Sequence, residues 1–197
     1  NNYDYLTQIT SLSFYVCSIE NIKRKDNTLT YIYTFLERVI HFYFNYEIVL
    51  RELLKDEEEE TRDKTITFCK GLLGELNVHV IGDLEKLPPH IFEGLQCIME
   101  KNKDSKKYNL YLAVAYDFKN DLYNLGTQKN PFYTREQSDI DIVLRSGGEY
   151  RLSGFFPAHI NYAEFFFVKP FWPDITMKKI NDVVCEFMTT RQRRFGM

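Results

Sequence analysis

Strand-like segments alternate with helix-like segments along this chain, and this alternation is the feature that most constrains its fold. Each candidate strand is a short run of apolar and β-rich residues, whereas the segments between them repeat apolar residues at three- and four-residue spacing. The predicted strands cover residues 11–16, 77–81, 109–115, 140–144 and 164–168. Strands separated by crossover helices pair in parallel. We therefore predict an α/β fold with a mostly parallel central sheet and helices on both faces.

The helix-like segments are less evenly spaced than the strands. Helices are predicted at residues 28–54 and 64–73, after Pro88-Pro89, and from Asp174 or Thr176 to Gly196. The acidic run at residues 56–60 is predicted to be a solvated loop or helix face. Residues 116–139 are predicted to be mostly loop, and they are few for a complete crossover helix with its connections.

Composition limits the classes of function that this chain can have. A length of 197 residues suits one domain, so we predict that residues 1–197 form a single domain. A net charge of −3 offers no basic face for nucleic acid, and no apolar run is long enough for a membrane span. The four cysteines and four histidines show no metal-binding spacing. We expect reduced thiols, and hence a reducing compartment.

A polar loop follows the predicted strand at residues 140–144. From Arg145 to Ser153 it reads Arg-Ser-Gly-Gly-Glu-Tyr-Arg-Leu-Ser. Guanidinium groups make charged, bidentate contacts with phosphate oxygens, and glycines permit a tight turn and a close approach of backbone amides. The loop is therefore a candidate diphosphate site. The alternative is a charged surface loop in which an arginine pairs with Glu149.

A lone carboxylate, Glu164, opens the very apolar strand predicted at residues 164–168. A carboxylate in such a place costs free energy unless it is paired or binds a metal ion. Beside a diphosphate the natural partner is Mg²⁺. A salt bridge at the end of the strand explains this residue equally well.

Ligands of open α/β sheets bind beyond the carboxyl ends of the strands. Three segments follow predicted strands and carry polar residues, namely 17–24, 115–120 and 145–153. We expect them to share one edge of the sheet.

Several stretches together resemble the cis-prenyltransferase family, which includes undecaprenyl diphosphate synthase and eukaryotic dehydrodolichyl diphosphate synthase. Residues 141–153, followed by Tyr162-Ala-Glu164 and Trp172-Pro-Asp174, resemble its long C-terminal signature in order and spacing. Residues 14–24 are similar to the family's YAFSxENxxR strand and loop, and residues 80–88 to its RxxGDxxxLP stretch. The resemblance runs from about residue 9 to the end of the chain.

The resemblance implies an enzyme that condenses isopentenyl diphosphate onto an allylic diphosphate, such as farnesyl diphosphate. The new double bond would be cis and the product a long polyprenyl diphosphate of the dolichol or undecaprenyl type. By the same resemblance, Arg145, Arg151 and Ser153 would hold the diphosphate of isopentenyl diphosphate. Glu164 would bind Mg²⁺.

The resemblance also assigns residues outside this pocket. Ser18, Asn21 and Arg24 would lie in a mobile loop between the two substrates, with Asn21 placed to assist the chemistry. Arg194 and Gly196 match the family's C-terminal RxG motif, which reaches the isopentenyl site of a dimer partner. On the residues alone, a basic helix end explains this segment equally well.

The family's N-terminal DGNxRW motif has no counterpart in residues 1–10. We therefore expect the first strand and helix of the fold to lie outside this sequence. Because the pocket residues and the RxG motif occur together, we predict a homodimer. We predict no nucleic-acid partner. Peripheral membrane association would serve product release, in the cytoplasm or at the cytosolic face of the endoplasmic reticulum. The alternatives are a non-catalytic subunit of a heterodimeric cis-prenyltransferase and an isoprenoid-binding domain without turnover.

Overall fold

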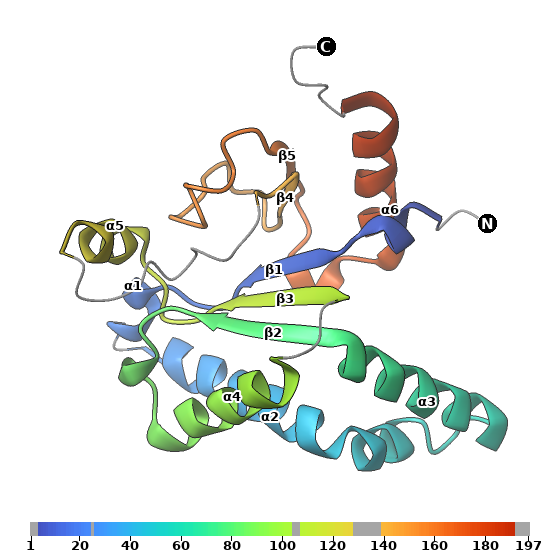
Figure 1. The fold of residues 1–197 in the computed structure, drawn as a ribbon. Helices are drawn as coiled ribbons and strands as arrows, with labels where there is room; N and C mark the ends of the chain where they lie inside the picture. Colours follow the sequence, from blue (N-terminus) through green and yellow to red (C-terminus); the bar gives the residue numbers. More distant parts are fainter. Residues whose placement is uncertain (1–3, 25, 104–106, 128–138, 192–197) are drawn as a thin grey trace. The chain divides into compact units, whose positions relative to one another are not determined.

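The computed structural model describes residues 4–24, 26–103, 107–127 and 139–191. The chain forms two compact units (Figure 1). One unit, Thr10–Asp117, holds the three-stranded sheet. The second unit combines the N-terminal residues up to Ile9 with the segment that begins at Phe118.

The sheet of the Thr10–Asp117 unit is parallel throughout. Strand β1 (Ser11–Tyr15) and strand β2 (Leu76–Ile81) lie on either side of β3 (Tyr108–Ala113). In the register of the sheet, Leu110 lies between Leu12 and Val78. The three strands start and end within two residues of the predicted limits, and the predicted parallel pairing is confirmed.

Two helices pack against one face of this sheet and form the core with it. Helix α2 (Thr28–Leu53) and helix α4 (Pro89–Asn102) lie side by side below the strands in Figure 1. Leu36 of α2 and Ile91 and Leu95 of α4 are completely buried. Burying an aliphatic side chain of this size contributes about 1.5–3 kcal/mol, so the interface between these two helices stabilises the unit substantially. The short elements α1 (Ile19–Ile22) and η2 (Leu84–Lys86) follow β1 and β2.

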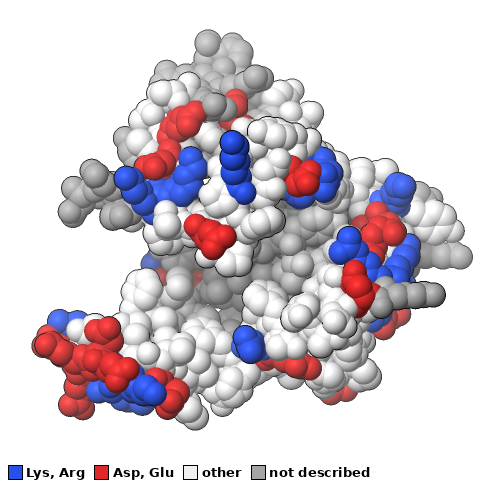
Figure 2. Space-filling model, turned by 180° about the vertical axis from the view of Figure 1, so that it is seen from behind, with Lys and Arg blue, Asp and Glu red and all other residues white. Residues whose placement is uncertain are grey.

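Helix α3 (Glu59–Glu75) is longer than predicted because it takes in the end of the acidic run. Glu59 and Glu60 stand in its first turn, where carboxylates interact favourably with the helix dipole. An ion pair between Arg51 and Asp63, 3.3 Å apart, joins α2 to α3. Figure 2 shows the charged side chains gathered at this junction of the two helices. The acidic run is thus both turn and solvated helix face, as predicted.

The second unit contains a separate two-stranded parallel sheet. It is formed by β4 (Ile142–Arg145) and β5 (Glu164–Phe167). The α/β class and the parallel pairing are confirmed, with the strands divided between two sheets. The remaining elements are η1 (Asp4–Gln8), α5 (Phe118–Thr127), η3 (Trp172–Asp174), α6 (Met177–Glu186) and a π-helical turn, η4 (Phe187–Arg191). That residues 1–197 form a single domain stays a prediction.

Two helical segments differ from the prediction. Residues 118–127 form helix α5 instead of loop. Helix α6 ends at Glu186, well before Gly196, which lies outside the described residues. The hydroxyl groups of Thr189 and Thr190 donate to the carbonyl oxygens of Cys185 and Glu186, at 2.7 and 2.6 Å. Such side-chain bonds favour a distorted helix end, which explains the π-helical turn.

No helix in the described part of the chain is long and apolar enough to cross a bilayer.

Candidate functional site

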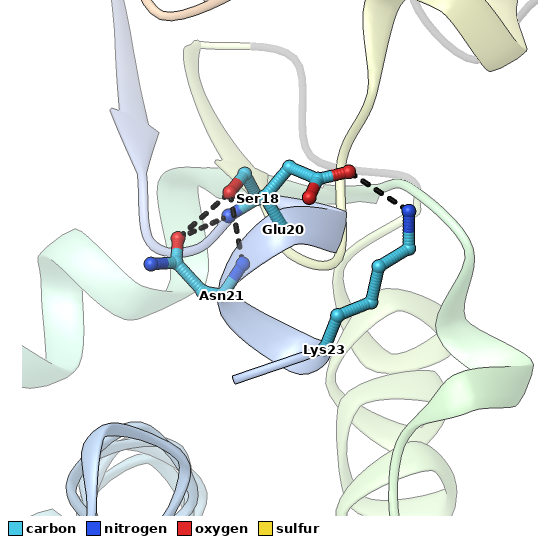
Figure 3. Close-up of polar contacts among 4 residues, drawn as sticks. All are labelled: Ser18, Glu20, Asn21 and Lys23. Atoms are coloured by element: carbon cyan, nitrogen blue, oxygen red, sulfur yellow. Dashed lines mark hydrogen bonds and ion pairs between the residues drawn. The ribbon is translucent and has the colours of Figure 1, made fainter. Parts of the chain in front are cut away.

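Ser18 and Asn21 form a closed hydrogen-bonded pair at the start of α1. The Asn21 backbone N–H donates to Ser18 Oγ at 3.2 Å, and the Ser18 backbone N–H donates to Asn21 Oδ1 at 2.9 Å. The Ser18 hydroxyl also donates to Asn21 Oδ1, at 2.8 Å (Figure 3). This is the reciprocal arrangement of a capping box, with asparagine at the third helical position. The two predicted residues are therefore held in one fixed geometry.

The capping box also decides which way the Asn21 amide points. Both Ser18 donors require an oxygen acceptor, so Oδ1 faces Ser18 and Nδ2 must point away from it (Figure 3). Among the described residues, none accepts a hydrogen bond from Nδ2. The arrangement leaves a positioned amide donor that can serve a ligand.

The charged side chains in and after α1 are more exposed than the box. Glu20 and Lys23 form an ion pair at 2.8 Å, with 76% and 64% of their side chains exposed, so the pair contributes little stability. Arg24 follows the helix and is exposed. The structure thus brings Ser18 and Asn21 together, while Arg24 extends into solvent.

Backbone bonds join this segment to the end of β3. Ser18 pairs with Tyr116 in an isolated parallel bridge, and the Ile19 N–H donates to the Tyr116 carbonyl oxygen at 3.1 Å. Segments 17–24 and 115–117 therefore share one edge of the sheet, as predicted. Residues 118–120 and 145–153 belong to the other unit, and their place at this edge stays a prediction. Sequence reasoning gave Tyr116 no role, because a contact made by backbone atoms leaves no residue-type signal.

Arg145 is the last residue of β4 and carries a buried donor. Its carbonyl oxygen accepts from the Val168 N–H at 2.8 Å. Its side-chain Nε is buried and has no hydrogen-bond partner among the described residues. A buried guanidinium donor without a hydrogen-bond partner is costly, and an oxygen of an anionic ligand would satisfy it.

The glycine pair after Arg145 forms the turn that was predicted. Gly147 and Gly148 have φ values of 84° and 70°, which glycine adopts without strain. Their N–H groups donate to the carbonyl oxygens of Pro170 and Val168, at 2.8 and 2.9 Å. The expectation that these amides approach a phosphate is therefore wrong, because the backbone of the segment after β5 already takes them.

Arg151 contacts Glu149 through an ion pair between Nη1 and Oε2. The ion pair with Glu149, which was the alternative interpretation of this loop, is thus present. The two side chains are 62% and 49% exposed, so the ion pair contributes little stability. Arg151 can therefore exchange Glu149 for another anion.

The loop then passes through left-handed backbone. Ser153, Gly154 and Phe156 have φ values of 54°, 81° and 41°. Phe156 is completely buried, whereas Ser153 is exposed. Residues held in this region of φ and ψ cluster at ligand sites, because only a well-packed surrounding structure maintains them.

Glu164 opens β5, and its N–H donates to the Asp141 carbonyl oxygen at 2.8 Å. The register pairs Ile142 with Glu164 and Arg145 with Phe167. Glu164 and Arg145 therefore stand at opposite ends of the two strands, roughly 10 Å apart along them. The described residues contain no group of three or more His, Cys, Asp or Glu side chains able to hold a metal ion. A single carboxylate still fits Mg²⁺, which commonly takes one carboxylate together with the phosphate oxygens of a substrate.

Arg194 and Gly196 lie outside the described residues.

Comparison with known proteins identifies the family. The prenyltransferase family model described as undecaprenyl diphosphate synthase matches residues 2–196. The chain therefore belongs to the cis-prenyltransferase family.

Individual relatives agree with this assignment. An isoprenyl transferase of Helicobacter pylori strain J99 is 26% identical over 208 residues, covering 96% of this chain and 78% of that protein. Dehydrodolichyl diphosphate synthase 4 of Arabidopsis thaliana is 32% identical over 146 residues, covering 62% of this chain and 50% of that protein. The crystal structure of a probable undecaprenyl diphosphate synthase from Campylobacter jejuni superposes with a TM-score of 0.70. It covers 98% of this chain and 86% of that one, at 23% identity, and supports the fold.

Proposed function

We propose that this chain condenses isopentenyl diphosphate onto an allylic diphosphate such as farnesyl diphosphate, with cis stereochemistry. The product would be a long polyprenyl diphosphate of the dolichol or undecaprenyl type. Membership of the family supports this activity. The observation that carries the proposal is the position of Arg145 at the end of β4, from which the chain leads directly into the loop with Arg151. The buried Nε of Arg145 has no hydrogen-bond partner among the described residues, which leaves this donor available to an anion.

In the proposed reaction the C1–O bond of the allylic diphosphate breaks and diphosphate leaves. The double bond of isopentenyl diphosphate forms the new C–C bond, and loss of one proton creates the new double bond. Arg145 and Arg151 would hold the isopentenyl diphosphate by charge-assisted hydrogen bonds. Arg151 would exchange its exposed partner Glu149 for a diphosphate oxygen. The hydroxyl of Ser153 would add a neutral contact.

Asn21 would act as a hydrogen-bond donor and not as a base. Its Oδ1 already accepts two hydrogen bonds from Ser18, which leaves Nδ2 for an oxygen of either diphosphate. A donor held in place before the reaction stabilises developing negative charge without reorganisation. Arg24, which is exposed, would supply positive charge to the same substrates. Mg²⁺ held by Glu164 would neutralise part of the diphosphate charge.

The proposed assembly is a homodimer in which Arg194 and Gly196 complete the isopentenyl site of the partner. A long apolar product is insoluble in water, so we also propose peripheral association with a membrane for its release, at the cytosolic face.

The test uses the protein expressed from its complete gene. Incorporation of radiolabelled isopentenyl diphosphate would be measured with farnesyl diphosphate and Mg²⁺, together with the Kd of isopentenyl diphosphate by calorimetry. We expect Arg145→Ala to weaken binding roughly 30-fold or more, since removing a buried charged partner costs about 2–5 kcal/mol. Arg62→Ala is the matched control, because Arg62 on α3 also has a buried Nε without a partner among the described residues.

Equal incorporation by the Arg145→Ala and Arg62→Ala proteins would rule out the pocket assignment. A wild-type protein that binds isopentenyl diphosphate but makes no product would instead be the non-catalytic subunit of a heterodimer.

A further inference from the structure

The backbone of Ala115 lies in the left-handed region although the residue is not glycine. Its φ is 51°, and it is completely buried two residues beyond the end of β3. A residue with a Cβ keeps this conformation only where its surroundings hold it there. The groups that hold Ala115 therefore determine the shape of the loop after β3.

Two loops hold Ala115, one on each of its backbone polar groups. Its N–H donates to Cys17 Sγ at 3.2 Å, and its carbonyl oxygen accepts from the Asp83 N–H at 3.2 Å. Beside Asp83, a Cβ added to Gly82 would lie 1.9 Å from the Val114 carbonyl oxygen, so the two backbones touch. The loop after β3 is thus clamped between the loops that follow β1 and β2.

The same segment determines where α1 begins. The Tyr116 N–H donates to the Cys17 carbonyl oxygen at 3.2 Å, and the Tyr116 carbonyl oxygen accepts from the Ile19 N–H at 3.1 Å. Ser18 is therefore flanked on both sides by residues bonded to Tyr116. Any shift of residues 115–116 would move the capping box as a whole.

We propose that Cys17 is a positioning residue, whose Sγ holds the Ala115 N–H and thereby places Ser18 and Asn21 for the condensation reaction. This inference rests on the proposed function. Cys17 is only 2% exposed. Burial raises the pKa of its thiol, which therefore stays neutral. Without the sulfur acceptor, a buried backbone N–H would have no partner, and the loop would rearrange to satisfy it.

The first test compares Cys17→Ala with Cys17→Ser in the incorporation assay. We expect Cys17→Ala to lower kcat roughly 10- to 100-fold, as small misplacements of catalytic groups do. The KM for isopentenyl diphosphate should stay within about twofold, since its proposed ligands belong to the Arg145–Ser153 loop. Cys17→Ser should recover most of kcat, because a hydroxyl oxygen can accept the same N–H. Cys97→Ala, which removes an exposed thiol from α4, is the control and should leave both constants unchanged.

A merely structural role of Cys17 would lower the folded fraction and would affect kcat equally in both variants. Equal loss in Cys17→Ala and Cys17→Ser, or no loss in Cys17→Ala, would overturn the inference.

Amide hydrogen exchange provides a second readout that does not depend on turnover. In Cys17→Ala, we expect the amides of Ala115 and Tyr116 to exchange at least about tenfold faster, while Leu112 inside β3 keeps its protection. Unchanged protection of Ala115 would contradict the proposed link. A wild-type protein that shows no incorporation would contradict the proposed function, and the exchange rates would still report on the contact between Cys17 and Ala115.

Discussion

The capping box at Ser18 and the loop at Arg145 are built in opposite ways. In the capping box, Ser18 and Asn21 satisfy one another through three hydrogen bonds. In the loop, Arg145 has a buried donor without a partner among the described residues, and Arg151 is paired only to an exposed carboxylate. The capping box is thus complete before a ligand arrives, whereas the loop holds positive charge that an anion would complete. The capping box therefore fixes the geometry of its side chains, whereas the loop presents positive charge to a ligand.

The left-handed residues of the two regions show the same contrast. Gly82, next to the capping box, has a φ of 138° and touches the backbone of Val114. Gly154, in the loop, has a φ of 81° and open space where a Cβ would stand. Close packing therefore enforces the conformation at Gly82, whereas an added side-chain atom at Gly154 would meet no neighbour.

The largest expected effect is a difference in the free energy of unfolding between the alanine variants of these two glycines. Gly82→Ala combines backbone strain with a collision against a backbone oxygen, so we expect a loss of about 3 kcal/mol or more. Gly154→Ala adds only the left-handed strain, about 1–2 kcal/mol. Urea denaturation of both variants measures the difference. Equal midpoints would show that the backbone around Gly82 is no more tightly packed than that around Gly154.

The next effect concerns the Asn21 amide. Asn21→Asp keeps both acceptor contacts from Ser18 but replaces Nδ2 with an oxygen, whereas Asn21→Ala removes the capping box as well. We expect both variants to lose roughly 100-fold in kcat, as on removal of one positioned donor. Only Asn21→Ala should also lose stability, by about 1 kcal/mol. Steady-state kinetics and thermal melts measure the two quantities. Wild-type kcat in Asn21→Asp would show that the amide nitrogen is not used.

The sequence predicted the strands of both units well because each is a short β-rich run between helical segments. Helix α5 was missed because Asn120, Asn124 and Gly126 are weak helix formers, so its apolar period is short and interrupted. Its residues form a helix in the context of the folded unit, which local propensity does not report.

The sequence indicates more of the geometry of the capping box than of the Arg145 loop. Ser18 and Asn21 stand three residues apart, and a capping box is a local pattern that sequence spacing can indicate. The separation of Arg145 from Glu164 depends on the register of β4 and β5, which the residue types do not determine. The use of the Gly147 and Gly148 amides likewise depends on where the chain after β5 runs.

The smallest expected effect tests whether Glu149 competes with a diphosphate for Arg151. Glu149→Gln removes the carboxylate that competes with a diphosphate for Arg151. We expect the KM for isopentenyl diphosphate to fall by at most about fivefold, because exposed ion pairs contribute up to about 1 kcal/mol. Glu100→Gln breaks another exposed pair, between Glu100 of α4 and Lys103 at the C-cap of that helix, and should leave KM unchanged. A rise in KM on Glu149→Gln would mean that Glu149 orients Arg151 for the substrate, and the loop would then be as fully prearranged as the capping box.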